Sequence, residues 1–441
     1  MNLADRVLDT RPLRSTRSFR YLFVGSAASS FGHQAATVAI LLQVWQLTGN
    51  PAWVGAVGLA NAVPMIAGGL VGGHLADAYD RRRLLVCTTL AGMLAAALLA
   101  GQARAGLDSL AVVLGLVAAQ SAAAALGAPA RRALLPRLLP KEQVAAGVAL
   151  IHVTFQAAML LGPTVGGLVA AEWGVATCYL LNAVAATVTL ACTVRLPAVP
   201  PADGAAGGSR PRTLLGGWHL VTRRPVLGGA FLTDLAATLL AMPIALFPMV
   251  NEERFGGDPR TLGLFLSAIA VGGVTAGLTS GFVTRRRRPG RVMLAAAGLW
   301  GLALAGFGLA GPLWPALACL AVAGAADTVS VISRGTIVQL ATPDAYRGRV
   351  GGLDHVVGAA APDLGNLRAG LVAGLTSSTV ALVAGGLTCV LAVAAVAVGV
   401  PAVRRFTWAA DAAPGRSDGI GGDSDGGRRP REAQPAGASA D

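Results

Sequence analysis

Charge is the property that this sequence most lacks. Asp, Glu, Lys and Arg together make up 13% of its 441 residues, about half the share that soluble globular domains carry. Hydrophobic residues make up 54%, and the mean hydropathy is positive. A chain so long and so poor in charge is typical of a polytopic membrane protein and not of a soluble enzyme.

Cysteine is scarce as well, and the few thiols are scattered. They fall singly inside apolar runs, at Cys87, Cys178, Cys192, Cys319 and Cys389. No two of them have the spacing of a metal site or a redox pair. We therefore expect no metal site and no disulfide framework.

Sequence motifs of catalysis are also missing. The phosphate-binding sequence Gly-x-x-x-x-Gly-Lys-Ser/Thr does not occur, which argues against an ATP-driven pump. No serine nucleophile and no pair of catalytic carboxylates rises above chance. We expect no enzymatic activity, no catalytic residues and no cofactor.

Apolar segments of membrane-spanning length fill the chain instead. A transmembrane helix needs about 20 such residues. Twelve segments qualify, at residues 19–46, 52–76, 84–104, 110–130, 143–171, 175–195, 226–251, 260–283, 291–311, 313–341, 349–375 and 378–401. The sequence therefore predicts an all-α integral membrane protein with twelve transmembrane helices.

The basic residues predict how the spans are oriented. One set of loops, together with both ends of the chain, collects nearly all of them, and the other set holds only Arg104, Arg254 and Arg260. Positive residues favour the cytoplasmic side, so we expect both termini in the cytoplasm. The net charge of +13 belongs to these loops and does not indicate nucleic-acid binding. No cleaved signal peptide is expected after the arginine-rich start.

The longest internal loop divides the spans into two groups of six. Residues 196–225 are rich in Pro, Gly and Ala, and we interpret them as a cytoplasmic linker. An N-terminal half at 19–195 and a C-terminal half at 226–401 would flank it. Residues 1–18 would form a cytoplasmic arm, and the polar, glycine-rich residues 402–441 a disordered cytoplasmic tail.

The turn between the second and third spans carries a motif. Gly73, Asp77, Arg81 and Arg82 have the spacing of a signature loop, and the sequence here resembles that of major facilitator transporters, with Asp80 in place of the usual glycine. The carboxylate of Asp77 could face the positive N-terminal end of another helix, and the arginines could pair with acids or lipid headgroups. We predict a charged conformational latch. The alternative is an ordinary positive loop.

A second copy of this turn follows the eighth span, at residues 281–291. Arg285 stands where the acid would be, so we expect this copy to act only as a topology anchor.

The fifth span contains Gly162-Pro163-Thr164-Val165-Gly166-Gly167. It resembles the Gly-Pro-x-x-Gly-Gly element of facilitator exporters. Gly162 and Gly166 have the spacing that lets helix backbones approach closely, and Pro163 removes a backbone donor. A close, kinked contact between the halves could seal one side of the transport cavity. Generic tight packing is the alternative.

Ionisable residues inside membrane spans are costly and are therefore functional candidates. We propose Asp234 and Asp363 for proton uptake, as buried carboxylates without partners. Asp327 and Arg334 share one helix face, about two turns apart, and could form a structural ion pair. Arg368 is poorly placed to pair with Asp363, and pairing between the tenth and eleventh spans remains possible.

Neutral polar residues in three N-terminal spans are candidates for lining a cavity. They are His33, Gln34, Gln120, His152 and Gln156. The fourth span lacks an arginine at its middle, which departs from the pattern of proton-coupled facilitators.

Three further stretches, at residues 13–23, 128–136 and 342–350, extend the resemblance over about residues 11–405. The chain resembles the branch of the major facilitator superfamily that holds the enterobactin exporter and bacterial multidrug and macrolide efflux proteins. This resemblance implies two pseudo-symmetric six-helix halves with a site between them.

The implied function is secondary active efflux of a small amphipathic molecule, a siderophore or a drug, across the bacterial cytoplasmic membrane by proton antiport. The partners would be the substrate, protons and membrane lipid, with no nucleic acid, and we expect a monomer. A facilitative uniporter or importer with the same fold is the alternative. An intramembrane enzyme or sensor would need a catalytic pair or a folded cytosolic domain, and neither is visible.

Overall fold

The computed structural model describes residues 9–197, 214–281, 287–343 and 346–407, and every regular element in these ranges is helical. The N-terminal elements are α2 (Arg11–Ser15), α3 (Arg17–Thr48), α4 (Pro51–Ala78), α5 (Arg81–Arg104), α6 (Leu110–Leu138), η1 (Lys141–Gln143), α7 (Val144–Trp173) and α8 (Val175–Val194). The C-terminal elements are α9 (Leu214–Arg223), α10 (Pro225–Ala241), η2 (Ile244–Leu246), α11 (Phe247–Phe255), α12 (Pro259–Leu278), α14 (Pro289–Leu309), α15 (Leu313–Ala341), α16 (Arg347–Leu375), α17 (Ser378–Gly399) and α18 (Pro401–Arg405).

Ten helices of the described chain are long and apolar enough to cross a membrane. The predicted first and eleventh spans, α3 and α16, are not among them, although they contain 32 and 29 residues. Both carry polar or charged residues along much of their length. Both also pack inside the bundle, α3 against α7 and α8, and α16 against α4. The fold-class prediction of an all-α membrane protein is confirmed, and the expected twelve spans are consistent with this structure.

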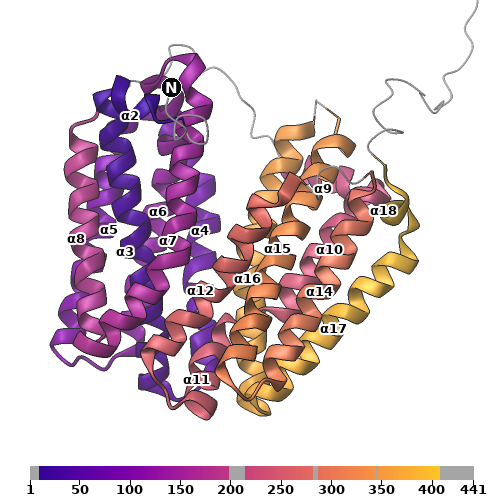
Figure 1. Cartoon of the computed structure of the whole chain (residues 1–441). Helices are drawn as coiled ribbons and strands as arrows, with labels where there is room; N and C mark the ends of the chain where they lie inside the picture. Colours follow the sequence, from indigo (N-terminus) through magenta and orange to yellow (C-terminus); the bar gives the residue numbers. More distant parts are fainter. Residues whose placement is uncertain (1–8, 198–213, 282–286, 344–345, 408–441) are drawn as a thin grey trace, which may run out of the picture.

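The helices form two groups that lie side by side (Figure 1). In the N-terminal group, α3 packs on α8 and α7, while α6 packs on α4 and α5. A buried hydrogen-bond network ties three of these helices together. Tyr179 of α8 donates to Gln43 of α3 at 2.8 Å, and Gln102 of α5 donates to the same side chain at 3.0 Å.

The C-terminal group differs from the prediction at the seventh span. Residues 226–251 were expected as one helix, but α10 ends at Ala241, and the chain continues through η2 into α11. Pro243 lies in this break, and proline cannot donate the backbone hydrogen bond of a continuous helix. Beside the break, the rings of Phe247, Phe265 and Phe307 pack edge to face, with centroids 5.4–5.7 Å apart.

Tight turns join the helices at one end of the bundle, which we call the α11 end. Gly49 ends α3 in the left-handed conformation, with φ at 56°, which suits glycine because it lacks a Cβ. Asn50 then caps α4 by accepting a hydrogen bond from the Ala52 backbone at 2.9 Å. The opposite end, which carries α2, α9 and α18 (Figure 1), we call the α2 end.

The two groups meet through α4 against α16 and through α7 against α12. The closest approaches lie in the parts of these helices nearest the α11 end. A Cβ added at Gly370 of α16 would lie 2.2 Å from the carbonyl oxygen of Pro51. One added at Gly263 of α12 would lie 2.4 Å from the carbonyl oxygen of Pro163. Glycine is therefore required where the halves touch.

A short helix occupies part of the predicted linker. Val221 of α9 is buried with Leu227 and Phe231 of α10, and Arg224 donates to the carbonyl of Ala341 at 3.2 Å. The linker thus ends as a helix attached to the C-terminal group. Residues 198–213 of the linker and residues 408–441 of the predicted tail lie outside the described residues.

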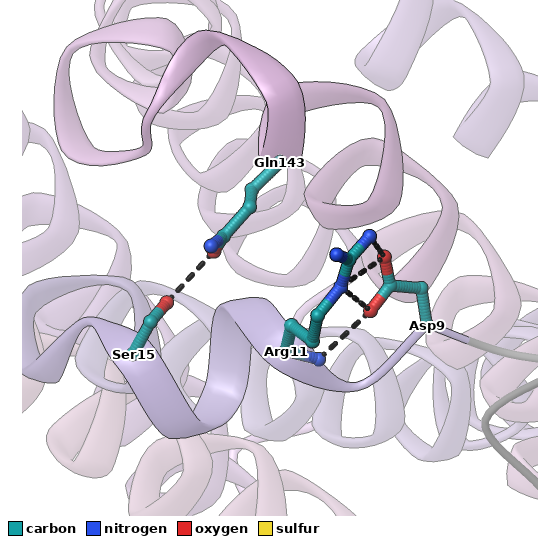
Figure 2. A network of polar contacts seen from close by, with 4 residues as sticks. All are labelled: Asp9, Arg11, Ser15 and Gln143. Atoms are coloured by element: carbon teal, nitrogen blue, oxygen red, sulfur yellow. Dashed lines mark hydrogen bonds and ion pairs between the residues drawn. The ribbon is translucent and has the colours of Figure 1, made fainter. Parts of the chain in front are cut away.

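The described part of the N-terminal arm, from residue 9 onward, is attached to the N-terminal group (Figure 2), and residues 1–8 lie outside the described residues. Ser15 of α2 donates to the side chain of Gln143, at the start of α7, at 2.7 Å. Beside it, Arg11 donates through its side chain and its backbone to Asp9, with the shortest bond at 2.6 Å. These hydrogen bonds stabilise the ionised carboxylate and hold the pKa of Asp9 below its usual value.

Candidate functional site

A cavity of about 650 Å³ lies inside the N-terminal group, among α3, α5, α6, α7 and α8. Its lining runs from the middle of these helices toward the first residues of α3, α5 and α7 and toward the last residues of α6 and α8. Because the chain alternates in direction, all of these segments lie toward the α2 end. The cavity is therefore on the opposite side from the close contacts that join the two groups.

Four of the five predicted lining residues face this cavity. His33, Gln34, Gln120 and His152 all line it. Gln156 is not part of the lining, so that prediction was wrong. Gln156 lies about one turn after His152 on nearly the same face of α7, but the lining that this helix contributes ends at Phe155.

The lining also includes residues that the sequence did not point to, among them Arg131 and Asn182. Arg131 was counted among the loop residues because the fourth span was expected to end at residue 130. In the structure, α6 continues to Leu138, and Arg131 lies on a helix. It is partly buried and forms no hydrogen bond or ion pair with any described residue.

The C-terminal group holds a buried ionic cluster. Arg334 of α15 forms an ion pair with Asp234 of α10, and its Nε lies 3.6 Å from a carboxylate oxygen of Asp354 on α16. The prediction that Asp234 is unpaired is therefore wrong. Asp327 and Arg334 do not pair among the described ion pairs. The contact of Arg334 with Asp354 is instead the pairing between the tenth and eleventh spans that the sequence left open.

Asp363, on α16, lies at the boundary between the two groups. A Cβ added at Gly58 of α4 would lie 2.7 Å from the carbonyl oxygen of Asp363. Its carboxyl group is half-buried and has no hydrogen bond or ion pair with a described residue. Arg368, one turn further on, donates instead to the backbone carbonyl of Leu240.

The glycine-rich motif of the fifth span has two faces. Gly162 and Gly166 pack on α3, where an added Cβ would lie 2.5 Å from the Cβ of Gln34 and 2.8 Å from the Cα of Ala35. Gly167 faces the other group, where an added Cβ would lie 2.6 Å from the carbonyl oxygen of Pro259. Only the second face lies at the boundary between the groups.

Polar contacts also join the two groups of helices at the α11 end. Arg260 of α12 forms an ion pair with Glu172 of α7, and both side chains are about half exposed. Thr164 of α7 donates to Ser267 of α12 at 2.7 Å. Trp45 of α3 donates to Glu252 of α11.

Only part of the predicted latch is described. Gly73 and Asp77 belong to α4, but their side chains lie outside the described residues. Arg81 begins α5, and its Nε is buried without a hydrogen-bond partner. Arg82 donates to the backbone carbonyl of Val194, at the end of α8. In the second copy of the turn, Arg285 lies outside the described residues.

The sequence of the chain is similar to that of known membrane exporters. A family model described as transmembrane secretion effector matches residues 9–414. The enterobactin exporter EntS of Shigella boydii serotype 18 is 29% identical over 365 residues, covering 80% of this chain and 84% of that protein. EntS of Escherichia coli O139:H28 matches to the same extent.

Solved structures share the fold at low sequence identity. The nucleoside transporter NupG, as a D323A mutant, has a TM-score of 0.74 at 14% identity, covering 87% of this chain and 99% of that one. A D-xylose–proton symporter has a TM-score of 0.68 at 15% identity, covering 89% and 100%. A bacterial homologue of the iron transporter ferroportin, in an inward-facing state, has a TM-score of 0.64 at 16% identity, covering 88% and 99%.

Proposed function

Since the chain belongs to the transmembrane secretion effector family of major facilitator exporters, we propose that it exports a small amphipathic molecule by proton antiport. The observation that carries this proposal is the separation of two features. The cavity lies toward the α2 end, and the groups are packed together at the α11 end. A solute could therefore enter from one side only.

The distribution of charge supports the cytoplasm as that side. Of the described basic residues, Arg104, Arg254 and Arg260 lie at the α11 end, and the loops of the α2 end hold the arginine clusters. Positive loops favour the cytoplasm. We infer an inward-facing state of a multi-pass protein in the bacterial cytoplasmic membrane, with both termini in the cytoplasm.

Proton coupling is proposed for the C-terminal group. Asp234 shares Arg334 with Asp354, so protonation of one acid would leave the cation to the other. Asp363 lies against Gly58, where the two groups must separate for the cavity to open outward. One charge that crosses 100 mV is worth about 2.3 kcal/mol, which is a useful bias between two states a few kcal/mol apart.

The latch remains part of this proposal. Arg81 and Arg82 lie where α5 begins, next to the end of α8, and Asp80 caps α5 by accepting from the backbone of Arg83 at 2.9 Å. We expect Asp77→Asn to slow the transport cycle. Arg285→Gln, in the degenerate copy, should alter only orientation or abundance, and equal transport defects in the two variants would contradict the latch.

An efflux assay tests the function directly. Cells that express the chain, and cells with empty vector, would be loaded with enterobactin, which the relatives' name makes the first compound to try, and in parallel with fluorescent amphipathic dyes. We expect export that stops when an uncoupler collapses the proton gradient. Export that continues with the uncoupler would contradict antiport, and uptake without a gradient would favour the uniporter.

A further inference from the structure

Arg131 is a cation inside a membrane helix and forms no hydrogen bond or ion pair with any residue that the structure describes. An arginine in a membrane span is costly unless it is paired or reaches water. Three other arginines in the described spans have acceptors. Arg334 has two carboxylates, Arg368 has the carbonyl of Leu240, and Arg254 has the carbonyl of Gly308 at 2.7 Å. Arg131 instead lines the cavity.

The described lining of the cavity contains no acidic group that could form an ion pair with this cation. No Asp or Glu is present among its lining residues in the described chain. His33, His152 and Asn182 add hydrogen-bonding groups that do not neutralise a guanidinium. Attraction between opposite charges strengthens as the surroundings become less polar, and the planar guanidinium matches a carboxylate through two parallel hydrogen bonds. The missing partner is therefore an anion.

The rest of the lining defines the remainder of the ligand. Met93, Leu135, Val148 and Phe155 contribute apolar surface. The cavity volume of about 650 Å³ falls within the range of small-molecule sites. A ligand that pairs with Arg131 and also covers this apolar surface has an apolar body and one acidic group.

We propose that the cavity binds an amphipathic organic anion, such as a carboxylate or phenolate, through the guanidinium of Arg131. This rests on the proposed function in one respect, namely that the exported molecule occupies this cavity. The anionic group of a membrane lipid has the same chemistry, so the test must distinguish a solute from a lipid headgroup.

Two fluorescent probes with the same ring system and opposite charge provide the test. Dansylglycine is an anion, and monodansylcadaverine is a cation. The full chain, in nanodiscs of phosphatidylcholine, would be titrated with each probe. We expect dansylglycine to bind at least about tenfold more tightly, since the guanidinium attracts its carboxylate and repels the ammonium group of monodansylcadaverine.

Neighbouring arginines give matched variants. Arg131→Gln should weaken dansylglycine binding about tenfold or more, and Arg131→Lys should restore part of it. Arg132 is adjacent but exposed and does not line the cavity, so Arg132→Gln should bind as the wild type does. Melting temperatures of all three variants establish that they are folded.

Three results would overturn the proposal. They are tighter binding of the cation, equal effects of Arg131→Gln and Arg132→Gln, and displacement of dansylglycine by added phosphatidylglycerol, which would assign the site to a lipid headgroup. Binding is measured without a proton gradient. Failure of antiport would therefore leave this result standing, and a cavity that prefers cations would leave the exporter proposal standing.

Discussion

The two groups of helices differ in how they accommodate an arginine inside the membrane. In the N-terminal group, Arg131 lines a cavity and has no hydrogen bond or ion pair within the described part of the chain. In the C-terminal group, Arg334 is buried between Asp234 and Asp354. A partnered charge can hold helices together or exchange a proton, whereas an unpartnered one is available to a solute. Under our two proposals, the N-terminal group binds the solute and the C-terminal group couples transport to protons.

Removal of the buried cation should produce the largest effect. Arg334→Ala leaves two carboxylates facing each other without a counter-charge, and breaking a buried ion pair from one side costs about 3–5 kcal/mol. Arg131→Ala removes no hydrogen bond or ion pair with a described residue, so its stability should change little. Yield and melting temperature of the purified variants check this, and equal losses would erase the distinction between the two groups.

Neutralising the acids should separate coupling from binding. Asp234→Asn leaves Arg334 paired with Asp354, and Asp363→Asn breaks no described contact, so both variants should fold. We expect uncoupler-sensitive efflux to fall about tenfold or more, equivalent to about 1.4 kcal/mol, with dansylglycine binding unchanged. Normal efflux by both variants would show that the coupling residues lie elsewhere.

The sequence predicted the spans better than the charges within them. Spans follow from runs of about 20 apolar residues, which are local, and the turns fell close to where they were expected. The partner of Arg334 on α10 could not be found this way, because Asp234 lies 100 positions away in the chain. Arg131 was missed for a different reason. An arginine at the end of an apolar run looks like a loop residue, and only the continuation of α6 to Leu138 shows that it lines the cavity.

A smaller effect should come from the glycines that let the two groups touch. Gly263→Ala would place a Cβ 2.4 Å from the Pro163 carbonyl, whereas Gly277, on the same helix, has open space. Overpacking typically costs 1–3 kcal/mol, so Gly263→Ala should melt earlier and transport more slowly. Gly277→Ala is the control, and matching behaviour would mean that the α11 end is less tightly packed than we infer.

The ion pair between the groups should matter less still. Arg260 and Glu172 are each about half exposed, and exposed pairs contribute about 0–1 kcal/mol. Glu172→Gln should lower the melting temperature slightly, and added salt should reduce the difference. The doubly exchanged variant, Glu172→Arg with Arg260→Glu, should recover it. A large effect that salt does not change would require another role for the pair.

Substitution of Asp9 in the N-terminal arm should have the smallest effect on the melting temperature, and this effect should not depend on pH near neutrality. Arg11 lowers the pKa of Asp9 in the folded chain, so the pair stabilises the fold above the unfolded pKa of about 3.9. That contribution is lost only as the pH falls through the still lower folded value. The small difference in melting temperature between wild type and Asp9→Asn should therefore be the same at about pH 6 and pH 8. Dansylglycine binding and uncoupler-sensitive efflux should not change, because no described residue of the arm lines the cavity or belongs to the ionic cluster. A difference that grows between these two pH values would mean that a group other than Asp9 titrates at the arm.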